Sequence, residues 1–352
     1  MTPEEWPLAA QAADEIASAR GAGGDRLGTI VTDFFLPPEQ RLTEQERALM
    51  TAMLDCLVGD IAAELRARLP VGLGAANDDA QSALVDTLSG AGLFDRPRLI
   101  ALLARRADEE RIALGARFRT GRRDARAVQA LVSHEDGEVA SAAMAVIVAR
   151  GKRRDRYGQC MVAIDDLSPP LAETLVPAIA AALSRQLPKG SAPGEVDGAL
   201  AQAADGVLAE RDPDSSVDAL TGALVRLLDQ RGLLDDQLIL AAASEGEIAF
   251  VAHGLARGAG IAGETALDEL LCGDSEQLIM FFRSAGASRQ LSAGILAAVG
   301  DLIGIADPGS ALDRFDRIGD QQAAAGQARL ASPPAYRRAL AALEGRYGKR
   351  SV

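Results

Sequence analysis

Two histidines, His134 and His253, are the only imidazoles in this chain of 352 residues, and they limit the catalytic chemistry that its sequence supports. A serine or cysteine nucleophile usually needs an imidazole beside it as general base. His134 stands in a short acidic segment typical of a turn, and His253 lies among Ala, Val and Leu residues. Glu247 and His253 could share a helix face, but two ligands do not complete a metal site. The pattern therefore predicts neither a catalytic triad nor a metal centre.

The cysteines and the glycine-rich segments also lack the spacing of known chemical motifs. Cys56, Cys160 and Cys272 are scattered, odd in number and set among apolar residues, which predicts buried thiols. The glycines of residues 21–24 lack the Lys-Ser/Thr pair of a phosphate-binding loop and a preceding strand. Acidic pairs such as the one at 235–236 precede apolar helices, where N-capping explains them. We therefore predict no catalytic residue, no cofactor and no metal.

The composition is typical of a helical protein. Hydrophobic residues make up 48% of the chain but aromatic residues only 3%, so Ala, Leu, Val and Ile supply the core. Alternating apolar and polar residues never persist long enough to predict a strand. The acidic N-terminus has no apolar region of a signal peptide, and no apolar run approaches the roughly 18 residues of a membrane span. We expect an all-α, cytoplasmic protein with no membrane contact.

The clearest single element is a long helix predicted from Thr43 to Leu69. Thr43 and Glu46 have the spacing of a capping box, and Pro70 would end the helix. Apolar residues recur within it at steps of three and four, in a stripe wider than one partner helix requires. We interpret this stripe first as core and second as a contact between two copies of the chain. The candidate dimer residues are Met50, Leu54, Leu57 and Ile61.

Similar junctions recur along the chain beyond Gly92. Each has an apolar helix end, an acidic turn that often contains Gly or Pro, and a new apolar helix. The first apolar residues after five such turns are Leu99, Val139, Val217, Ile248 and Leu278. They are 40, 78, 31 and 30 residues apart, and the spacing of 78 is close to two steps of 39. Periods of 30 to 40 residues are typical of α-solenoids built from degenerate HEAT-like or armadillo-like repeats. The alternative is an Ala-rich helical bundle whose acidic N-caps reflect no repeat.

Composition shifts divide the chain into four predicted segments. Residues 1–40 form an N-terminal helical arm, and residues 41–92 hold the long helix with its candidate dimer face. Residues 93–190 form helical repeats with a basic edge, and residues 191–352 form acidic repeats that end in a capping helix. We place one boundary near residue 190 because residues 188–194, which are rich in Pro and Gly, are the stretch most typical of a linker.

Positive charge is concentrated in one part of an acidic chain. The whole sequence has 37 basic and 50 acidic residues and a net charge of −13, whereas residues 96–156 hold 15 basic and eight acidic residues. Arginines at the ends of successive repeats would lie along one edge of a solenoid, where they would attract an acidic partner. The candidate residues of this basic edge are Arg105, Arg106, Arg122, Arg123, Arg126, Lys152, Arg153 and Arg154.

Three interpretations of the basic edge are open at the level of sequence. It could be a solvated face neutralised by acids of the same chain, a contact for an acidic protein or a second copy, or a nucleic-acid surface. The low isoelectric point, near 4.8, and the scarcity of aromatic residues weigh against nucleic acid. If the edge binds a protein, changing Arg122 and Arg153 to Glu is expected to weaken that binding without altering helicity.

Segments in two regions of the sequence, one near each end, resemble a known family. Residues 243–256 (ASEGEIAFVAHGLA) and 281–286 (FFRSAG) are similar to the C-terminal half of an uncharacterised alphaproteobacterial family of HEAT-like helical proteins. Residues 33–36 and 42–49 are similar to the helix entry near the N-terminus of that family. The resemblance covers most of residues 25–305. It implies an all-helical repeat fold, and it implies no catalytic residue because the family has no assigned activity.

These observations predict a helical-repeat scaffold or adaptor that presents a surface to another protein and does not catalyse a reaction. Its partner is expected to be an acidic protein or a second copy of the chain. One alternative is binding of a phosphate backbone through residues 96–156. The other is an enzyme or small-ligand binder with a site between repeats.

Overall fold

The computed structural model describes most of the chain: residues 42–70, 80–121, 127–186, 193–271, 274–333, 336–337 and 339–340. The chain divides into two compact units, residues 1–47 and residues 48–352, and only 42–47 of the first unit are described. Every regular element in the described ranges is a helix, and the only β-bridge among them pairs Arg154 with Cys160. The all-α prediction is therefore confirmed. None of the described helices is long and apolar enough to cross a membrane.

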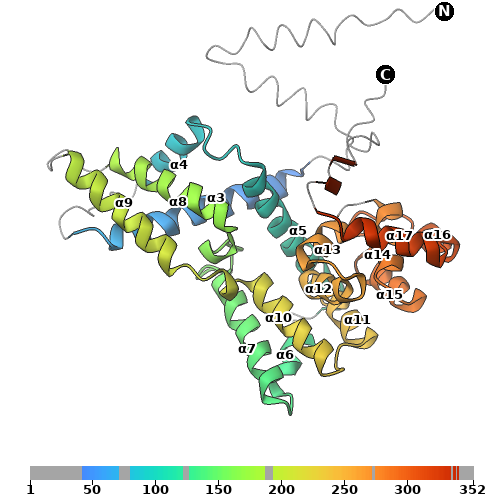
Figure 1. Cartoon of the computed structure of the whole chain (residues 1–352). Coiled ribbons are helices and arrows are strands. Elements are labelled where there is room, and N and C mark those ends of the chain that lie inside the picture. The colour runs from blue at the N-terminus through green and yellow to red at the C-terminus, as the bar shows by residue number, and fades with distance from the viewer. Residues whose placement is uncertain are drawn as a thin grey trace, which may run out of the picture. The chain divides into compact units, whose positions relative to one another are not determined.

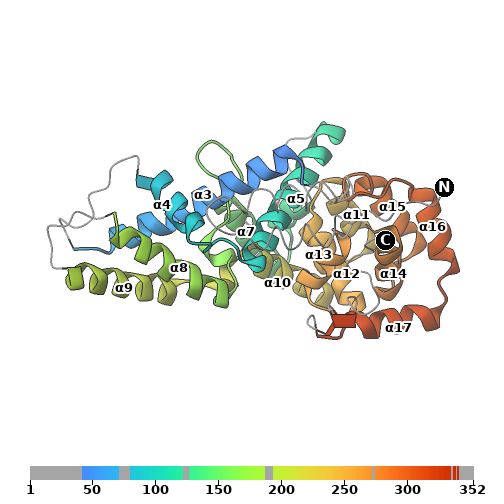
Figure 2. The ribbon, with the colours of Figure 1, turned by 90° about the horizontal axis from the view of Figure 1, so that it is seen from above.

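Long helices form the first of two hydrophobic cores in the larger unit, which we call the amino-terminal core. Its helices are α3 (Glu44–Ala67), α4 (Ala80–Gly90), α5 (Pro97–Thr120), α8 (Pro169–Ser184) and α9 (Pro193–Glu210). Helix α8 packs against both α9 and α4. Figures 1 and 2 show α3, α4, α8 and α9 gathered side by side. This core joins helices from three of the four predicted segments.

Shorter helices form the carboxy-terminal core. They are α6 (Ala127–Ala130), α7 (Gly137–Lys152), α10 (Val217–Gln230), α11 (Asp236–Ser244), α12 (Ile248–Ala259), α13 (Gly263–Leu270), α14 (Ser275–Ser284), α15 (Arg289–Val299) and α16 (Pro308–Arg317), with α17 (Asp320–Leu330) packed on α14. In the described part of the chain, 3₁₀ turns connect helices at η2 (Leu131–Ser133), η3 (Ile164–Asp166) and η4 (Pro213–Ser215). Helix α5 also contributes Ile112 to this core, so it runs through both.

The long helix α3 forms as its sequence predicts. The N–H of Glu46 donates to Thr43 Oγ1 at 3.2 Å, and the N–H of Thr43 donates to the Glu46 carboxylate at 2.8 Å, which completes the capping box. The helix ends at Ala67, three residues before Pro70. Its apolar stripe lies within the amino-terminal core, as the core interpretation predicts. Met50, Leu57 and Ile61 are buried in that core, and Leu54 packs against it at partial burial.

The predicted acidic turns do begin helices. Asp136 accepts the N–H of Glu138 at 2.9 Å, and Asp235 accepts the N–H of Leu238 at 2.8 Å. All five apolar residues predicted to follow such turns are buried: Leu99, Val139, Val217, Ile248 and Leu278. Packing partners, however, are not always neighbours in sequence. Helix α7 packs on α10 and α11 packs on α15, while α8 and α9 belong to the amino-terminal core.

Glycines allow very close contacts in the carboxy-terminal core. A Cβ atom at Gly258 of α12 would lie 2.0 Å from the carbonyl oxygen of Ala285, just after α14. Gly246 has a φ of +76°, and a Cβ there would lie 2.8 Å from Cα of Ala113 in α5. The turn before α12 therefore crosses α5 at a distance that only glycine permits.

Candidate interaction surface

Five charged side chains form a buried ionic cluster where the two cores meet. It consists of Arg106 and Glu109 of α5, Arg153 after α7, Asp166 of η3 and Asp218 of α10. Arg106 is only 1% exposed, and its Nη2 lies 2.7 Å from Oδ2 of Asp218. Its Nη1 contacts the Glu109 carboxylate one turn along the same helix. Helices α5 and α10 are therefore joined by a charge pair inside the protein.

Arg153 extends the cluster to the connection between α7 and α8. Its Nε donates to both carboxylate oxygens of Asp166, at 3.1 and 3.0 Å. Arg153 also lies 3.6 Å from Asp218, and Arg106 lies 3.7 Å from Asp166, so the two arginines share the two aspartates. Because both guanidinium groups are buried and paired, they do not form part of an exposed edge. Arg106 and Arg153 are instead neutralised by acids of the same chain.

Electrostatic attraction keeps Asp218 and Arg106 ionised. Burial alone would raise the pKa of Asp218, but Arg106 and Arg153 outweigh burial and hold that pKa below its ordinary value. Burial also opposes the charge on Arg106, and the three surrounding carboxylates outweigh it, so the pKa of Arg106 is raised. Removing one member would leave its partners charged in a place without bulk water, which is costly.

Other members of the predicted basic edge are divided between ion pairs and solvent. Arg105 lies 2.9 Å from Asp268 of α13, and Arg154 lies 2.6 Å from Glu110 of α5. Lys152, at the end of α7, is exposed. Arg122, Arg123 and Arg126 lie outside the described residues. Among the described members, the four arginines are thus neutralised by acids of the same chain.

The periodicity of α5 predicts that Arg106 is buried, whereas a count of charges does not. Leu99, Leu103 and Arg106 follow one another at steps of four and three, which places them on one helix face. Both leucines are buried, so the guanidinium group must be buried with them. Its partner Asp218 is 112 residues away in sequence, and no local pattern identifies it.

Neither histidine has catalytic surroundings. Nδ1 of His134 accepts the N–H of Asp136 at 3.1 Å in the turn before α7. The ring of His253 occupies space left by two glycines, since a Cβ atom at Gly222 or Gly263 would lie 2.9 or 2.1 Å from its Cε1. Burial lowers the pKa of His253, which favours a neutral ring packed between α10 and α13. In the part of the chain that the structure describes, no group of His, Cys, Asp and Glu could hold a metal ion.

The two cysteines that the structure describes are weak nucleophiles. Cys56 and Cys160 are free and half-buried, and Cys272 lies outside the described residues. Burial, reinforced by the charge of Glu110, raises the pKa of Cys160 to about 11. Its thiol therefore stays protonated at neutral pH, whereas the thiolate is the reactive form.

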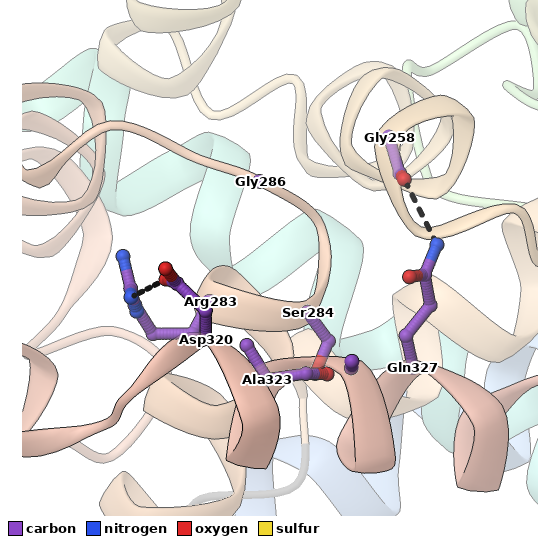
Figure 3. Close-up of a pocket in the computed structure, with 8 residues that line it drawn as sticks. Gly258, Arg283, Ser284, Gly286, Asp320, Ala323 and Gln327 are labelled. Atoms are coloured by element: carbon purple, nitrogen blue, oxygen red, sulfur yellow. Dashed lines mark hydrogen bonds and ion pairs between the residues drawn. The ribbon is translucent and has the colours of Figure 1, made fainter.

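An open hollow of about 330 Å³ lies between α12, α14 and α17 (Figure 3). Its polar groups point at one another: Arg283 lies 3.1 Å from Asp320, and Gln327 Nε2 donates to the carbonyl oxygen of Ala259 at 3.1 Å. Ser284 donates to the carbonyl oxygens of Met280 and Ala323. These bonds tie α17 to its neighbours, and they leave no set of side chains that converges on a ligand.

Apolar side chains are exposed near the end of α5. Phe118 is 91% exposed, and Leu114, one turn earlier on the same face, is 46% exposed. Arg117 lies beside them at partial exposure, and the basic segment 122–126 follows in the sequence. We call Leu114, Arg117 and Phe118 the α5 patch. The opposite side of α5 is anchored, since Arg119 lies 2.8 Å from Asp301 and a Cβ at Gly115 would lie 2.7 Å from Leu302.

A second apolar surface lies along α7. It borders an open hollow of about 510 Å³ between α7, η4 and α10. Met144 and Val148 of α7 are 46% and 56% exposed there, and Lys152 lies at the end of the hollow. We call this surface the α7 groove; it is lined by Ser141, Met144, Ala145, Val148, Ala149, Lys152, Ser215 and Leu220.

Comparison with known proteins places the chain in a family. The family model for uncharacterised proteins conserved in bacteria, DUF2336, matches residues 88–328. The chain belongs to this family. No curated protein and no solved structure matches the chain. The DUF2336 match includes α5, both apolar surfaces and all five residues of the ionic cluster, and it begins at the end of α4.

The match agrees with part of the resemblance noted in the sequence. It confirms an uncharacterised bacterial family across most of the same residues. The description of DUF2336 names neither an activity nor a repeat.

Proposed function

We propose that this protein is a non-enzymatic adaptor that binds an acidic segment of another protein through the α5 patch. The observation that carries the proposal is the exposure of Phe118 beside Leu114 and Arg117. Aromatic and arginine side chains contribute most of the binding energy in many interfaces. A ring that is 91% exposed on an anchored helix is therefore suited to enter a pocket on a partner.

Charge supports an acidic partner. Most arginines of residues 96–156 that the structure describes are paired internally, but Arg117 lies at the surface beside two apolar side chains. Beyond Arg119, which pairs with Asp301, the next charges along the chain are in the basic segment 122–126. Such a mixture attracts a segment that carries both acidic and apolar residues. A phosphate backbone is favoured less, because the neutralised arginines leave few charges for phosphate contacts.

We further propose that the turns of residues 93–330 form degenerate HEAT-like repeats in which each acidic turn starts a buried helix. The burial of the five apolar residues that follow these turns supports this view. In this interpretation, α8 and α9 depart from the repeat pattern and pack into the amino-terminal core. The repeats provide a rigid base for α5 and leave its patch free for contact.

The test compares proteins captured from the source bacterium by three forms of the full chain. Leu114→Ser with Phe118→Ser removes the patch, and Ile100→Ser is the matched control because Ile100 is also on α5 and 44% exposed. We expect a captured protein that is lost with the patch variant and retained with the control. Its binding should weaken with added salt, because opposite charges attract less strongly under screening. Capture unaffected by the patch variant would contradict the proposal, and so would captured nucleic acid in place of protein.

A further inference from the structure

One face of α7 has the spacing of a helix-to-helix contact. Five residues of this face recur at steps of three, four, three and four: Glu138, Ser141, Ala145, Val148 and Lys152. The opposite face is buried in the carboxy-terminal core. A 3-4 repeat of this kind is the seam along which two helices pack in a coiled coil. The small side chains at 141 and 145 would let a second helix approach closely.

The seam lies beside an apolar hollow large enough to take side chains of another helix. Met144 and Val148 project at its border, and Leu220 of α10 forms part of its far wall. Because α7 and α10 already pack on each other, two such pairs brought face to face would form a four-helix arrangement. Burying Met144 and Val148 in this way would remove apolar surface from water.

The two ends of α7 carry opposite charge. Glu135, Asp136 and Glu138 surround the start of the helix, where Arg231 pairs with the last two. Glu138 keeps 71% of its side chain exposed despite that pair. Lys152 stands at the other end, where it is exposed. Two copies of α7 side by side in opposite directions would therefore bring each basic end to an acidic end, whereas parallel copies would bring like charges together.

We propose that two copies of the chain associate through antiparallel α7 helices, with Ala145 at the two-fold axis. Glu138 and Lys152 are each seven residues from Ala145. Lys152 of one copy then faces Glu138 of the other, and Ser141 of one copy faces Val148 of the other. Each contact occurs twice, as an isologous interface requires. The α5 patch lies on a different helix, so this association is independent of the function proposed above.

The first test is the mass of the full chain in solution, measured by sedimentation equilibrium over a range of concentrations. We expect a monomer–dimer equilibrium. Val148→Glu should weaken the dimer at least tenfold, because it places charge at the seam of both copies. Ile100→Glu, at a similarly exposed position on α5, should leave the dimer unchanged. A monomer at every concentration would overturn the proposal, and so would a dimer that Val148→Glu does not weaken.

The second test uses charge reversal to establish whether the two α7 helices run antiparallel. Lys152→Glu should weaken the dimer at least tenfold, because it brings two acidic groups together at each end. Adding Glu138→Lys to the same chain should recover most of the association. A double variant no better than Lys152→Glu alone would contradict antiparallel pairing. Circular dichroism checks that these surface variants keep their helicity.

The third test locates the two-fold axis. In a chain with its three native cysteines changed to serine, Ala145→Cys should give a covalent dimer with a short bismaleimide. Ile100→Cys is the control and should give almost none. Equal crosslinking at the two positions would contradict an axis at residue 145. Loss of partner capture with the α5 patch variant, and an intact dimer in that variant, would show that the two surfaces act separately.

Discussion

The two cores of this protein bury apolar side chains by different means. The amino-terminal core uses helices α3 and α5 of 24 residues each, with α8 and α9 of 16 and 18. In the carboxy-terminal core, α11 to α16 have only 8 to 12 residues. The N–H and C=O groups without partners at the two ends make up a larger share of a short helix. Its stability therefore depends more on the hydrogen bonds that those end groups make.

The starts of the helices differ in the same way, except that α3 of the amino-terminal core is capped by Thr43. In the amino-terminal core, α5 and α8 begin with Pro in the first turn, and the residues before them, Arg96 and Ser168, make no side-chain cap bond. In the carboxy-terminal core, Asp or Ser side chains cap most of the helices whose caps are described. These are α7, α10, α11, α14, α15 and α16.

Close contacts and charges complete the comparison. Glycines bring helices of the carboxy-terminal core within van der Waals contact, as Gly258 does beside Ala285. The junction between the cores is held by the buried ionic cluster, whose members come from segments that serve both. Each core is therefore packed by different means, and charge pairs connect the two cores.

The largest effect is expected from Arg106→Ala, which leaves three buried carboxylates with one guanidinium group. Breaking a buried ion pair on one side costs about 3–5 kcal/mol of unfolding free energy. Because the cluster joins both cores, hydrogen exchange should speed up in α8 and in α12 together. The control is Arg257→Ala, which breaks an ion pair with Asp229 in which both side chains are more than 40% exposed, with an expected cost of about 0–1 kcal/mol. Loss of protection in one core alone would break the comparison.

Asp218→Asn should show how far the cluster depends on ionisation. We expect a loss of about 1.5–3 kcal/mol at pH 7, because hydrogen bonds to a charged group are lost. The pKa of Asp218 is lower in the folded protein than in the unfolded chain, where it is about 3.9. The ionised carboxylate therefore stabilises the fold above pH about 3.9, and this contribution is lost as the pH falls through the pKa of the folded state. The difference between variant and wild type should therefore shrink below pH about 4 in urea titrations. A difference that grows on acidification would show that Asp218 is not held ionised.

Two glycine substitutions compare the packing of the cores directly. Gly258→Ala should cost about 1–3 kcal/mol, because a Cβ there would lie 2.0 Å from the Ala285 carbonyl oxygen. Gly198→Ala in α9 meets no atom within 4 Å, so it should stabilise the protein by about 0.5–1 kcal/mol. Thermal unfolding measures both. Equal effects of the two substitutions would contradict the difference in packing.

The smallest change in stability is expected from substitutions at helix N-caps. Asp235→Ala removes the cap of α11 and should cost about 1 kcal/mol. Ser168→Ala precedes α8, where the serine side chain makes no cap bond, and should change stability by less than about 0.5 kcal/mol. Urea denaturation at pH 7 checks the pair. A larger cost at Ser168 than at Asp235 would reverse the assignment of caps to the two cores.

The fold could be predicted from sequence wherever the signal is local. The capping box of Thr43, the stop near Pro70 and the N-cap of Asp136 depend on residues a few positions apart. The apolar stripe of α3 also predicted burial correctly. Whether its partner was the same chain or a second copy could not be read from the stripe, because both bury the same face.

The candidate site was less predictable because its contacts are distant in sequence. Charge counts placed Arg106 and Arg153 on an edge, but their partners Asp166 and Asp218 draw them inside. Exposure of Phe118 could not be predicted either, since an aromatic residue in a helix is usually buried. The α7 seam combines small residues with one Lys and one Glu, a pattern that only the burial of the opposite face makes visible.

The most direct test of the whole account is a pair of charge reversals in the same arginine-rich region, followed by thermal unfolding. Arg153→Glu places a fourth acid in the buried cluster and should lower the melting temperature by about 5–10 °C. Arg117→Glu changes the surface of the α5 patch and should lower it by less than about 1 °C while weakening partner capture. An unchanged melting temperature for Arg153→Glu, together with lost capture, would contradict the division between internal and surface arginines.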